Sequence, residues 1–239
     1  MPVPARTLVL AHSPLTGAAA WGELPDVLRA RGHEVVVLDV TDDDEPPYAS
    51  RYVARAAVQI TAAAPSRPVH LVGHSGAGYL LPQIGAARRS ARDGVAGYVF
   101  VDAGAPHGRN ATRLTLLRGE DPTAAGELEE LLARGGRFPS WRDEDLRELV
   151  PDDTRRTALV ASLRPRGPDF FTETLPYPGD WPDAPCGFLK LSSSYDVPAR
   201  VARSRGWPMV SAALTGGHFA ACTDPVGVAE ALENLLTRM

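Results

Sequence analysis

Residues 69–78 read Val-His-Leu-Val-Gly-His-Ser-Gly-Ala-Gly, and they combine the end of an apolar run with a serine among small residues. A helix-compatible stretch, residues 79–89, follows directly. A sharp strand-to-helix turn would hold Ser75 in a strained backbone conformation, for which Gly73, Gly76 and Ala77 leave room. Such a nucleophile elbow presents the serine hydroxyl above a sheet and predicts that Ser75 is a nucleophile. The simpler interpretation is a glycine-rich turn in which Ser75 only caps the helix.

The rest of the chain alternates between strand-like and helix-like stretches. Apolar runs predict strands at residues 7–11, 34–39, 69–72, 95–101, 187–191 and 209–214. Apolar residues at helical spacing predict helices at residues 21–31, 50–64, 78–89, 197–205 and 225–238. Near-continuous Val and Leu runs are typical of parallel strands buried on both faces. The pattern therefore predicts an α/β fold: a doubly wound, mainly parallel sheet of about six strands with helices on both faces.

One connection is too long for this pattern. Residues 103–185 span roughly 80 residues, whereas strand-to-helix loops usually have fewer than ten. We expect this cap segment (residues 103–185) to be a helical insertion after the strand that ends near Asp102. The core is then formed by residues 1–102 and 186–239. Short cap helices are expected at residues 123–134, 142–149 and 153–163, and His107 is expected on a surface turn.

Composition narrows the classes of partner. The chain has 239 residues, 44% of them hydrophobic, which suffices for one large domain. Its net charge is −4, with 25 basic and 29 acidic residues intermixed, so neither nucleic acid nor an anionic membrane is an expected partner. We expect a small-molecule substrate and a monomer or homodimer. No signal-peptide or membrane-span pattern is present in the sequence, which favours a cytoplasmic protein.

Neither metal nor cofactor is expected. Cys186 and Cys222 are too few and too far apart for a thiolate metal site, and they are expected to be reduced. The acidic residues 42–45 are followed by Pro46 and Pro47 without the spacing of a calcium loop, so we expect them to form a solvated loop.

A serine nucleophile needs a base and an orienting carboxylate at the same end of the sheet. His218 follows the last predicted strand, in Leu-Thr-Gly-Gly-His-Phe, and precedes the last helix. Asp196 follows the strand ending near residue 191, which gives the order Ser, Asp, His. Asp102, at the end of the strand before the cap segment, is the alternative acid.

These residues resemble the α/β-hydrolase superfamily. The elbow Gly73-His74-Ser75-Gly76-Ala77-Gly78, the Tyr195-Asp196 turn and the Gly217-His218 turn occur in its order, over almost the whole chain. The resemblance implies a mainly parallel sheet, a helical cap and a triad of Ser75, Asp196 and His218. His12-Ser13-Pro14 likewise resembles the family's oxyanion loop.

The oxyanion loop departs from the family pattern. Pro14 stands where a backbone N–H normally faces the developing oxyanion, and proline has no such donor. Losing one donor costs about 3 kcal/mol of transition-state stabilisation. The Gly76 N–H remains as one donor. We expect the Leu15 N–H, or alternatively the Ser13 hydroxyl, to be the second.

The predicted reaction is hydrolysis of a small, largely apolar carboxylic ester, lactone or thioester through an acyl-enzyme. The alternatives are a lyase, an eliminating enzyme or a cyclase, in which Ser75 and His218 only transfer protons, and a ligand-binding protein. We expect a mainly apolar pocket. Its candidate substrate contacts are His12, Ser13, Pro14, His74, Phe138, Trp141, Phe171 and Phe219.

Overall fold

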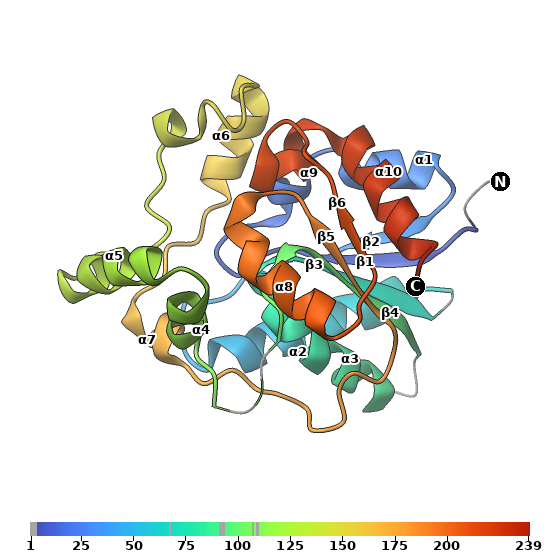
Figure 1. Cartoon of the computed structure of the whole chain (residues 1–239), viewed down its shortest axis with the longest axis horizontal. Coiled ribbons are helices and arrows are strands. Elements are labelled where there is room, and N and C mark those ends of the chain that lie inside the picture. The colour runs from blue at the N-terminus through green and yellow to red at the C-terminus, as the bar shows by residue number, and fades with distance from the viewer. Residues whose placement is uncertain (1–3, 67, 91–93, 107, 109) are drawn as a thin grey trace.

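A six-stranded, all-parallel sheet forms the centre of the molecule (Figure 1). The computed structural model describes residues 4–239 except 67, 91–93, 107 and 109, so His107 lies outside the described residues. The strands are β1 (Thr7–Ala11), β2 (Glu34–Val37), β3 (Val69–Ser75), β4 (Val95–Ala103), β5 (Cys186–Lys190) and β6 (Met209–Ser211). Their spatial order is β2-β1-β3-β4-β5-β6. The predicted fold class is confirmed.

Alternating side chains of the strands enter two separate hydrophobic layers. Val9 and Leu71 pack against α2 (Tyr48–Ala63), α3 (Leu81–Ser90) and α8 (Asp196–Ser204). Leu8 and Val72 point to the other face, where α1 (Leu24–Ala30) and α10 (Pro225–Leu236) cover the sheet. Figure 1 shows these two groups of helices on opposite sides of the strands. Because successive strand residues face opposite ways, apolar runs without alternation are needed to fill both layers.

Strand lengths differ from the expected ones at the edges and at the centre. The edge strands β2 and β6 end at Val37 and Ser211, earlier than expected, and β6 pairs with β5 over three positions. The central strand β3 instead extends to Ser75, because β4 continues beside it as far as Ala103. Pairing on both sides thus lengthens the strand that carries the candidate nucleophile.

In its described residues, the cap segment contains four α-helices and one short 3₁₀ helix. They are α4 (Arg113–Glu120), α5 (Pro122–Ala133), α6 (Asp153–Ala161), α7 (Pro168–Thr172) and the 3₁₀ helix η3 (Asp143–Leu146). Figure 1 shows the α-helices gathered on one side of the core. Helices α5 and α6 lie near their expected positions, and the Asp152 side chain accepts the Arg155 N–H at the start of α6.

Three parts of the cap segment differ from expectation. Within residues 142–149, where a helix was expected, the short 3₁₀ helix η3 covers Asp143–Leu146. Helices α4 and α7 were not predicted. The buried residues of α4 include Arg113 beside Leu116, so the apolar spacing that signals a helix is interrupted. Helix α7 has five residues, too few for a periodic pattern.

Short helices follow the carboxyl ends of several strands and line the region where the candidate residues meet. They are η1 (Ala18–Trp21), η2 (Gly76–Leu80), η4 (Ser193–Tyr195), η5 (Gly217–Phe219) and α9 (Ala220–Thr223). Across the described part of the chain, no helix combines the length and apolar character required to cross a membrane.

Candidate active site

Ser75 occupies a strained turn between β3 and η2. Its backbone has φ +57° and ψ −127°, a region that residues with a Cβ rarely adopt. The next turn is tightly packed: a Cβ on Gly78 would lie 2.3 Å from the Gly104 carbonyl oxygen. A Cβ on Gly76 would lie 3.1 Å from Ser13 Oγ. The small residues around Ser75 therefore permit the turn, as expected for a nucleophile elbow.

The carboxylate that contacts His218 is Asp102, near the end of β4. Its Oδ2 lies 3.0 Å from His218 Nδ1. Asp102 is fully buried and also accepts the backbone N–H groups of Leu191 and Ser192, at 2.8 and 3.0 Å, and the Ser192 hydroxyl, at 2.6 Å. Burial by itself raises the pKa of Asp102, but these hydrogen bonds outweigh it and hold the pKa below its usual value. Asp102 is therefore an ionised acceptor that orients the imidazole.

Asp196 does not contact His218, so the expected pair is corrected by the structure. Asp196 is the first residue of α8, its side chain is about half exposed, and it forms an ion pair with Lys190. Asp102 lies near the end of a strand, whereas Asp196 begins the helix that follows the next strand. Their burial differs, because β4 is central in the sheet whereas α8 begins at the surface.

Tyr195 is a site residue that the sequence analysis missed. Its hydroxyl is hydrogen-bonded to Ser75 Oγ at 3.0 Å, and its ring stacks on His218 with centroids 5.0 Å apart and an interplanar angle of 9°. Within the described residues, no hydrogen bond joins Ser75 to His218 directly. The only sequence signal was an aromatic residue next to the expected acid.

His74, the residue before the serine, packs against His218. Its ring stacks on His218 at 4.4 Å, and its Nε2 donates to the His218 carbonyl oxygen at 2.9 Å. Burial, followed by the neighbouring His218, lowers the pKa of His74 to about 3, so the ring is neutral. His74 does not line the cavity, contrary to expectation.

His12 also has a structural position rather than a place in the cavity wall. Its Nδ1 donates to the Ser13 carbonyl oxygen at 2.8 Å, and its Nε2 accepts the Val40 N–H at 3.0 Å. Burial lowers the pKa of His12, which matches an imidazole that donates at one nitrogen and accepts at the other. The expected contact of His12 with substrate is therefore corrected: His12 holds the loop that contains Ser13.

The oxyanion loop presents a side chain where a backbone donor was expected. The Leu15 N–H donates to Ser13 Oγ at 3.2 Å, so this N–H is already engaged. Ser13 Oγ lies beside Gly76, the residue after Ser75. Because its oxygen accepts from Leu15, the Ser13 hydroxyl hydrogen is available to another acceptor. This arrangement favours Ser13 over the expected Leu15 as the second oxyanion donor.

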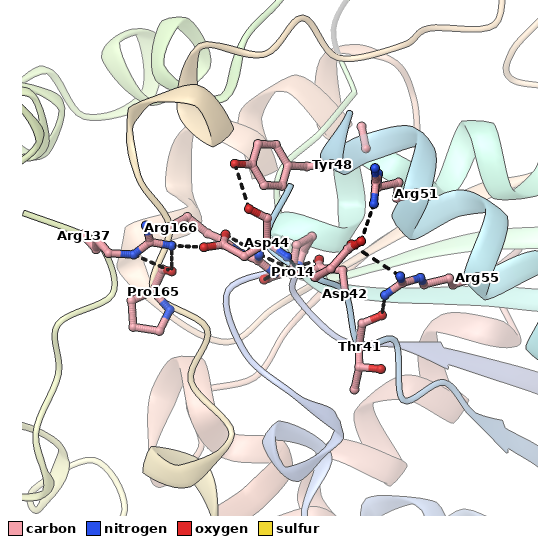
Figure 2. A network of polar contacts seen from close by, with 12 residues as sticks. Pro14, Thr41, Asp42, Asp44, Tyr48, Arg51, Arg55, Arg137, Pro165 and Arg166 are labelled. Atoms are coloured by element: carbon pink, nitrogen blue, oxygen red, sulfur yellow. Dashed lines mark hydrogen bonds and ion pairs between the residues drawn. The ribbon is translucent and has the colours of Figure 1, made fainter. Parts of the chain in front are cut away.

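The loop is held from the cap segment by a cluster that we call the loop clamp (Asp42, Asp44, Arg164 and Arg166). Figure 2 shows the Arg166 guanidinium between Pro14 and the two aspartates. Its Nη2 donates to the Pro14 carbonyl oxygen at 3.3 Å and to Asp42 at 2.8 Å, and its Nη1 donates to Asp44 at 2.7 Å. The Arg164 N–H donates to the Leu15 carbonyl oxygen at 2.9 Å.

The expected solvated loop at residues 42–45 is exposed at Asp43, Asp44 and Glu45, and only the Asp42 side chain departs from this expectation. The Arg166 and Asp42 side chains are only 2% and 7% exposed, so part of the acidic run is enclosed by cap residues. In the described part of the chain, no group of His, Cys, Asp and Glu is arranged to hold a metal ion.

A cavity of about 660 Å³ lies over the candidate residues. Core residues Ser13, Ser75, Tyr195 and His218 form its floor. Six further residues for which the sequence predicted a role in the site also line the cavity: Pro14, Leu15, Phe138, Trp141, Phe171 and Phe219. The structure thus brings six of the eight expected substrate contacts to one cavity and leaves out His12 and His74.

Five described cap residues in the cavity wall are polar: Arg113, Glu120, Asp121, Glu127 and Ser140. Asp121, Glu127 and Ser140 are exposed, whereas Arg113 is buried and Glu120 is half-buried. Glu120, the last residue of α4, accepts a hydrogen bond from the Tyr79 hydroxyl at 3.1 Å. Burial raises the pKa of Glu120 to about 7, against the opposing effect of that hydrogen bond. Arg113 is 8% exposed, lies over the Phe170 ring and pairs with Glu173. Sequence reasoning did not single out Glu120 or Arg113, since nothing in the local sequence indicated that α4 faces the cavity.

Comparisons with known proteins agree with this architecture. The model of a family described as the alpha/beta hydrolase family matches residues 8–231. A search of curated proteins gave no match. Among solved structures, an extracellular α/β-hydrolase from a Paenibacillus species, described as homologous in structure and function to tobacco salicylic acid binding protein 2, is similar with a TM-score of 0.75. The two are 18% identical, and the match covers 96% of this chain and 98% of that one.

Two further similar structures have different described activities. Tomato methylketone synthase I has a TM-score of 0.69 and 18% identity, with 98% of this chain and 99% of that chain covered. A pyrethroid hydrolase from Sphingobium faniae has a TM-score of 0.66 and 19% identity, with 98% of each chain covered. At these identities the likeness establishes the fold, and one fold supports different reactions.

Proposed function

Because the chain belongs to the α/β-hydrolase family, we propose that it is a serine hydrolase of small, largely apolar carboxylic esters, lactones or thioesters. The observation that carries this proposal is that Ser75 and His218 line one cavity, while buried Asp102 lies behind the cavity wall and contacts His218 at 3.0 Å. A strained serine beside an oriented histidine is the arrangement that acyl transfer requires.

The proton path follows from the hydrogen bonds of His218. Asp102 holds the Nδ1–H, which leaves Nε2 to act as the base. The Ser75 hydroxyl exchanges its hydrogen bond with Tyr195 for one with His218 as substrate binds. Ser75 Oγ then attacks the carbonyl carbon while Nε2 takes its proton. The imidazolium gives that proton to the leaving alcohol or thiol.

The second half of the reaction uses the same groups. Water attacks the acyl-enzyme while His218 takes a proton from the water. The bond between the acyl group and Ser75 Oγ then breaks, the imidazolium returns its proton to Ser75 Oγ, and the carboxylic acid leaves. In both halves the carbonyl oxygen becomes an oxyanion. The Gly76 N–H and the Ser13 hydroxyl are the proposed donors to it, since Pro14 has no N–H and the Leu15 N–H already donates to Ser13.

A second candidate function is proton-transfer catalysis without an acyl-enzyme, as in a lyase. Two observations favour it: Pro14 removes one backbone donor, and Ser75 is hydrogen-bonded to Tyr195 rather than to His218. In this reaction His218 and Ser75 would move a proton to or from the substrate, and a weaker oxyanion site would suffice.

The test is intact-protein mass spectrometry after incubation with a fluorophosphonate, together with turnover of p-nitrophenyl esters of increasing chain length. A serine hydrolase gives rapid addition of one phosphonyl group and ester turnover, and Ser75→Ala loses both. The matched control is Ser140→Ala, which changes another cavity-lining serine and should keep both labelling and turnover at the wild-type level. Absence of labelling and of turnover in folded protein would reject acyl transfer and favour the second candidate.

A further inference from the structure

The end of α4 places a carboxyl group in the cavity wall, and none of the described residues forms an ion pair with it. Glu120 lines the cavity beside Leu117, Leu128 and Leu131. Its Oε1 accepts from Tyr79, and within the described residues Oε2 has no hydrogen-bond partner. Oε2 is also absent from the buried unpaired atoms of the described chain, so solvent or a ligand can reach it. An acceptor is therefore open to the cavity.

Glu120 lies in the neighbourhood of the nucleophile. Its partner Tyr79 belongs to η2, the turn that begins directly after Ser75. Electrostatic effects of Glu120 raise the pKa of both Tyr79 and Tyr195, after the larger effect of burial, and Tyr195 holds Ser75 Oγ. Ser75 and Glu120 also line the same cavity, so one bound molecule can contact both.

The charges around Glu120 limit what it can bind. An anionic substituent would be repelled by the carboxylate. Two other carboxylates line the cavity, those of Asp121 and Glu127, but both residues are exposed to solvent, which screens their charge. A cationic substituent would still have to lose its hydration beside the half-buried Glu120, in a cavity whose wall also holds the buried guanidinium of Arg113. A neutral hydrogen-bond donor meets neither penalty and satisfies the open acceptor.

Building on the proposed hydrolase function, we propose that Glu120 is a specificity-determining residue that accepts a hydrogen bond from a hydroxyl group of the substrate. The substrate class is accordingly a hydroxylated carboxylic ester, lactone or thioester rather than a simple alkyl ester. A site built to bind a hydroxyl discriminates against the analogue that lacks it, because the polar group of the protein is then left unpaired.

The experiment compares kcat/KM for ethyl hexanoate, for ethyl hexanoates with a hydroxyl at successive chain positions, and for hydroxyethyl hexanoate. Wild-type protein should prefer at least one hydroxy ester by about tenfold, the worth of one hydrogen bond. Glu120→Leu should bring that ratio close to one. Glu130→Leu removes the same charge from an exposed position of α5 and should keep the wild-type ratio.

A second variant and a pH series separate recognition from a structural role. Glu120→Gln keeps an acceptor oxygen of the same shape, so it should keep a preference for the hydroxy ester. In wild type that preference should increase as Glu120 ionises, because both oxygens of a carboxylate accept hydrogen bonds whereas a protonated carboxyl donates at one of them. In Glu120→Gln the preference should not change with pH.

The outcomes that overturn the inference differ from failure of the proposed function. Equal hydrolysis of alkyl and hydroxy esters by wild type, or an unchanged preference in Glu120→Leu, would overturn the role of Glu120 while leaving the hydrolase intact. A pH-dependent preference that persists in Glu120→Gln would do the same. No hydrolysis of any ester together with no fluorophosphonate labelling would instead reject the proposed function itself.

Discussion

The imidazole of His218 is oriented by a carboxylate that is itself fixed by four hydrogen bonds. Asp102 receives these bonds from His218, from the Leu191 and Ser192 backbones and from the Ser192 hydroxyl. Loss of its charge would leave the imidazole in the wrong tautomer and its imidazolium form unstabilised. Asp196 has no such connection, because its side chain pairs with Lys190 at the surface.

Asp102→Asn is therefore expected to lower kcat for an ester substrate by about 10⁴-fold with little change in KM. Asp196→Asn, the matched control, should change kcat by less than about threefold, since exposed ion pairs contribute little. Steady-state kinetics of both variants on one p-nitrophenyl ester measures the difference. A larger loss in Asp196→Asn than in Asp102→Asn would return the acid role to Asp196.

The Ser13 hydroxyl gives a second test at this scale. Ser13→Ala should lower kcat by about 100- to 1000-fold, the usual effect of removing one oxyanion donor. Ser13→Thr keeps the hydroxyl and should retain most of the activity. If Ser13→Ala stays within a few-fold of wild type, the Leu15 N–H, freed from its bond to Ser13 Oγ, is the better assignment.

At the scale of elements, the cap segment and the oxyanion loop form one unit. Arg166, between α6 and α7, reaches the Pro14 carbonyl oxygen and two aspartates that follow β2. Phe138 and Arg166 also form an antiparallel bridge within the cap segment. The contacts of Arg166 with Pro14 and the two aspartates join segments more than a hundred residues apart, and they position the loop on which Ser13 lies.

Replacing Arg166 of the loop clamp should destabilise the fold, because the Asp42 side chain would remain buried without its partner. Arg166→Met is expected to lower the free energy of unfolding by about 3–5 kcal/mol. Arg137→Met removes an exposed arginine that also pairs with Asp44 and should cost less than about 1 kcal/mol. Urea unfolding at neutral pH compares them, and equal losses would show that the clamp contributes no more than a surface ion pair.

At the scale of the whole molecule, the parallel sheet brings distant residues to one edge. Ser13, Ser75, Asp102, Tyr195 and His218 all lie at or after the carboxyl ends of different strands. The ends of parallel strands meet on the same side of an open sheet, which is where such folds bind ligands. The cap segment closes this side and supplies Glu120, whose burial is unfavourable for the folded state.

The raised pKa of Glu120 predicts a pH dependence of stability. The folded protein keeps the Glu120 proton up to about pH 7, whereas the unfolded chain loses it near pH 4.5. Between these values the native state binds more protons, so the free energy of unfolding falls as pH rises. The loss is on the order of 3 kcal/mol and is complete above pH 7.

Glu120→Gln should remove this decline and be more stable than wild type above neutral pH. Urea unfolding of both proteins at acidic and mildly alkaline pH isolates the effect, since all other titrating groups are common to the two. Parallel stability curves would contradict the raised pKa of Glu120.

Much of the fold was predictable because its signals are local. Val- and Leu-rich runs specified the parallel strands, and helical spacing specified α2, α5 and α10, since each pattern depends only on neighbours along the chain. The elbow around Ser75 was recognisable because its small residues meet a local steric requirement. The ends of the edge strands were missed because pairing with the neighbouring strand decides them. Helix α4 was missed because buried Arg113 interrupts its apolar spacing.

The sequence by itself thus determined the α/β architecture, the elbow at Ser75 and the position of His218 after the last strand. The tertiary structure alone decided that Asp102 rather than Asp196 contacts His218, that Tyr195 holds Ser75, and that Arg166 and Glu120 reach the site. The physical reason is that the strength of a carboxylate, hydroxyl or guanidinium contact depends on its burial and on partners far away in the chain. Only the folded packing of strands and cap sets these two quantities.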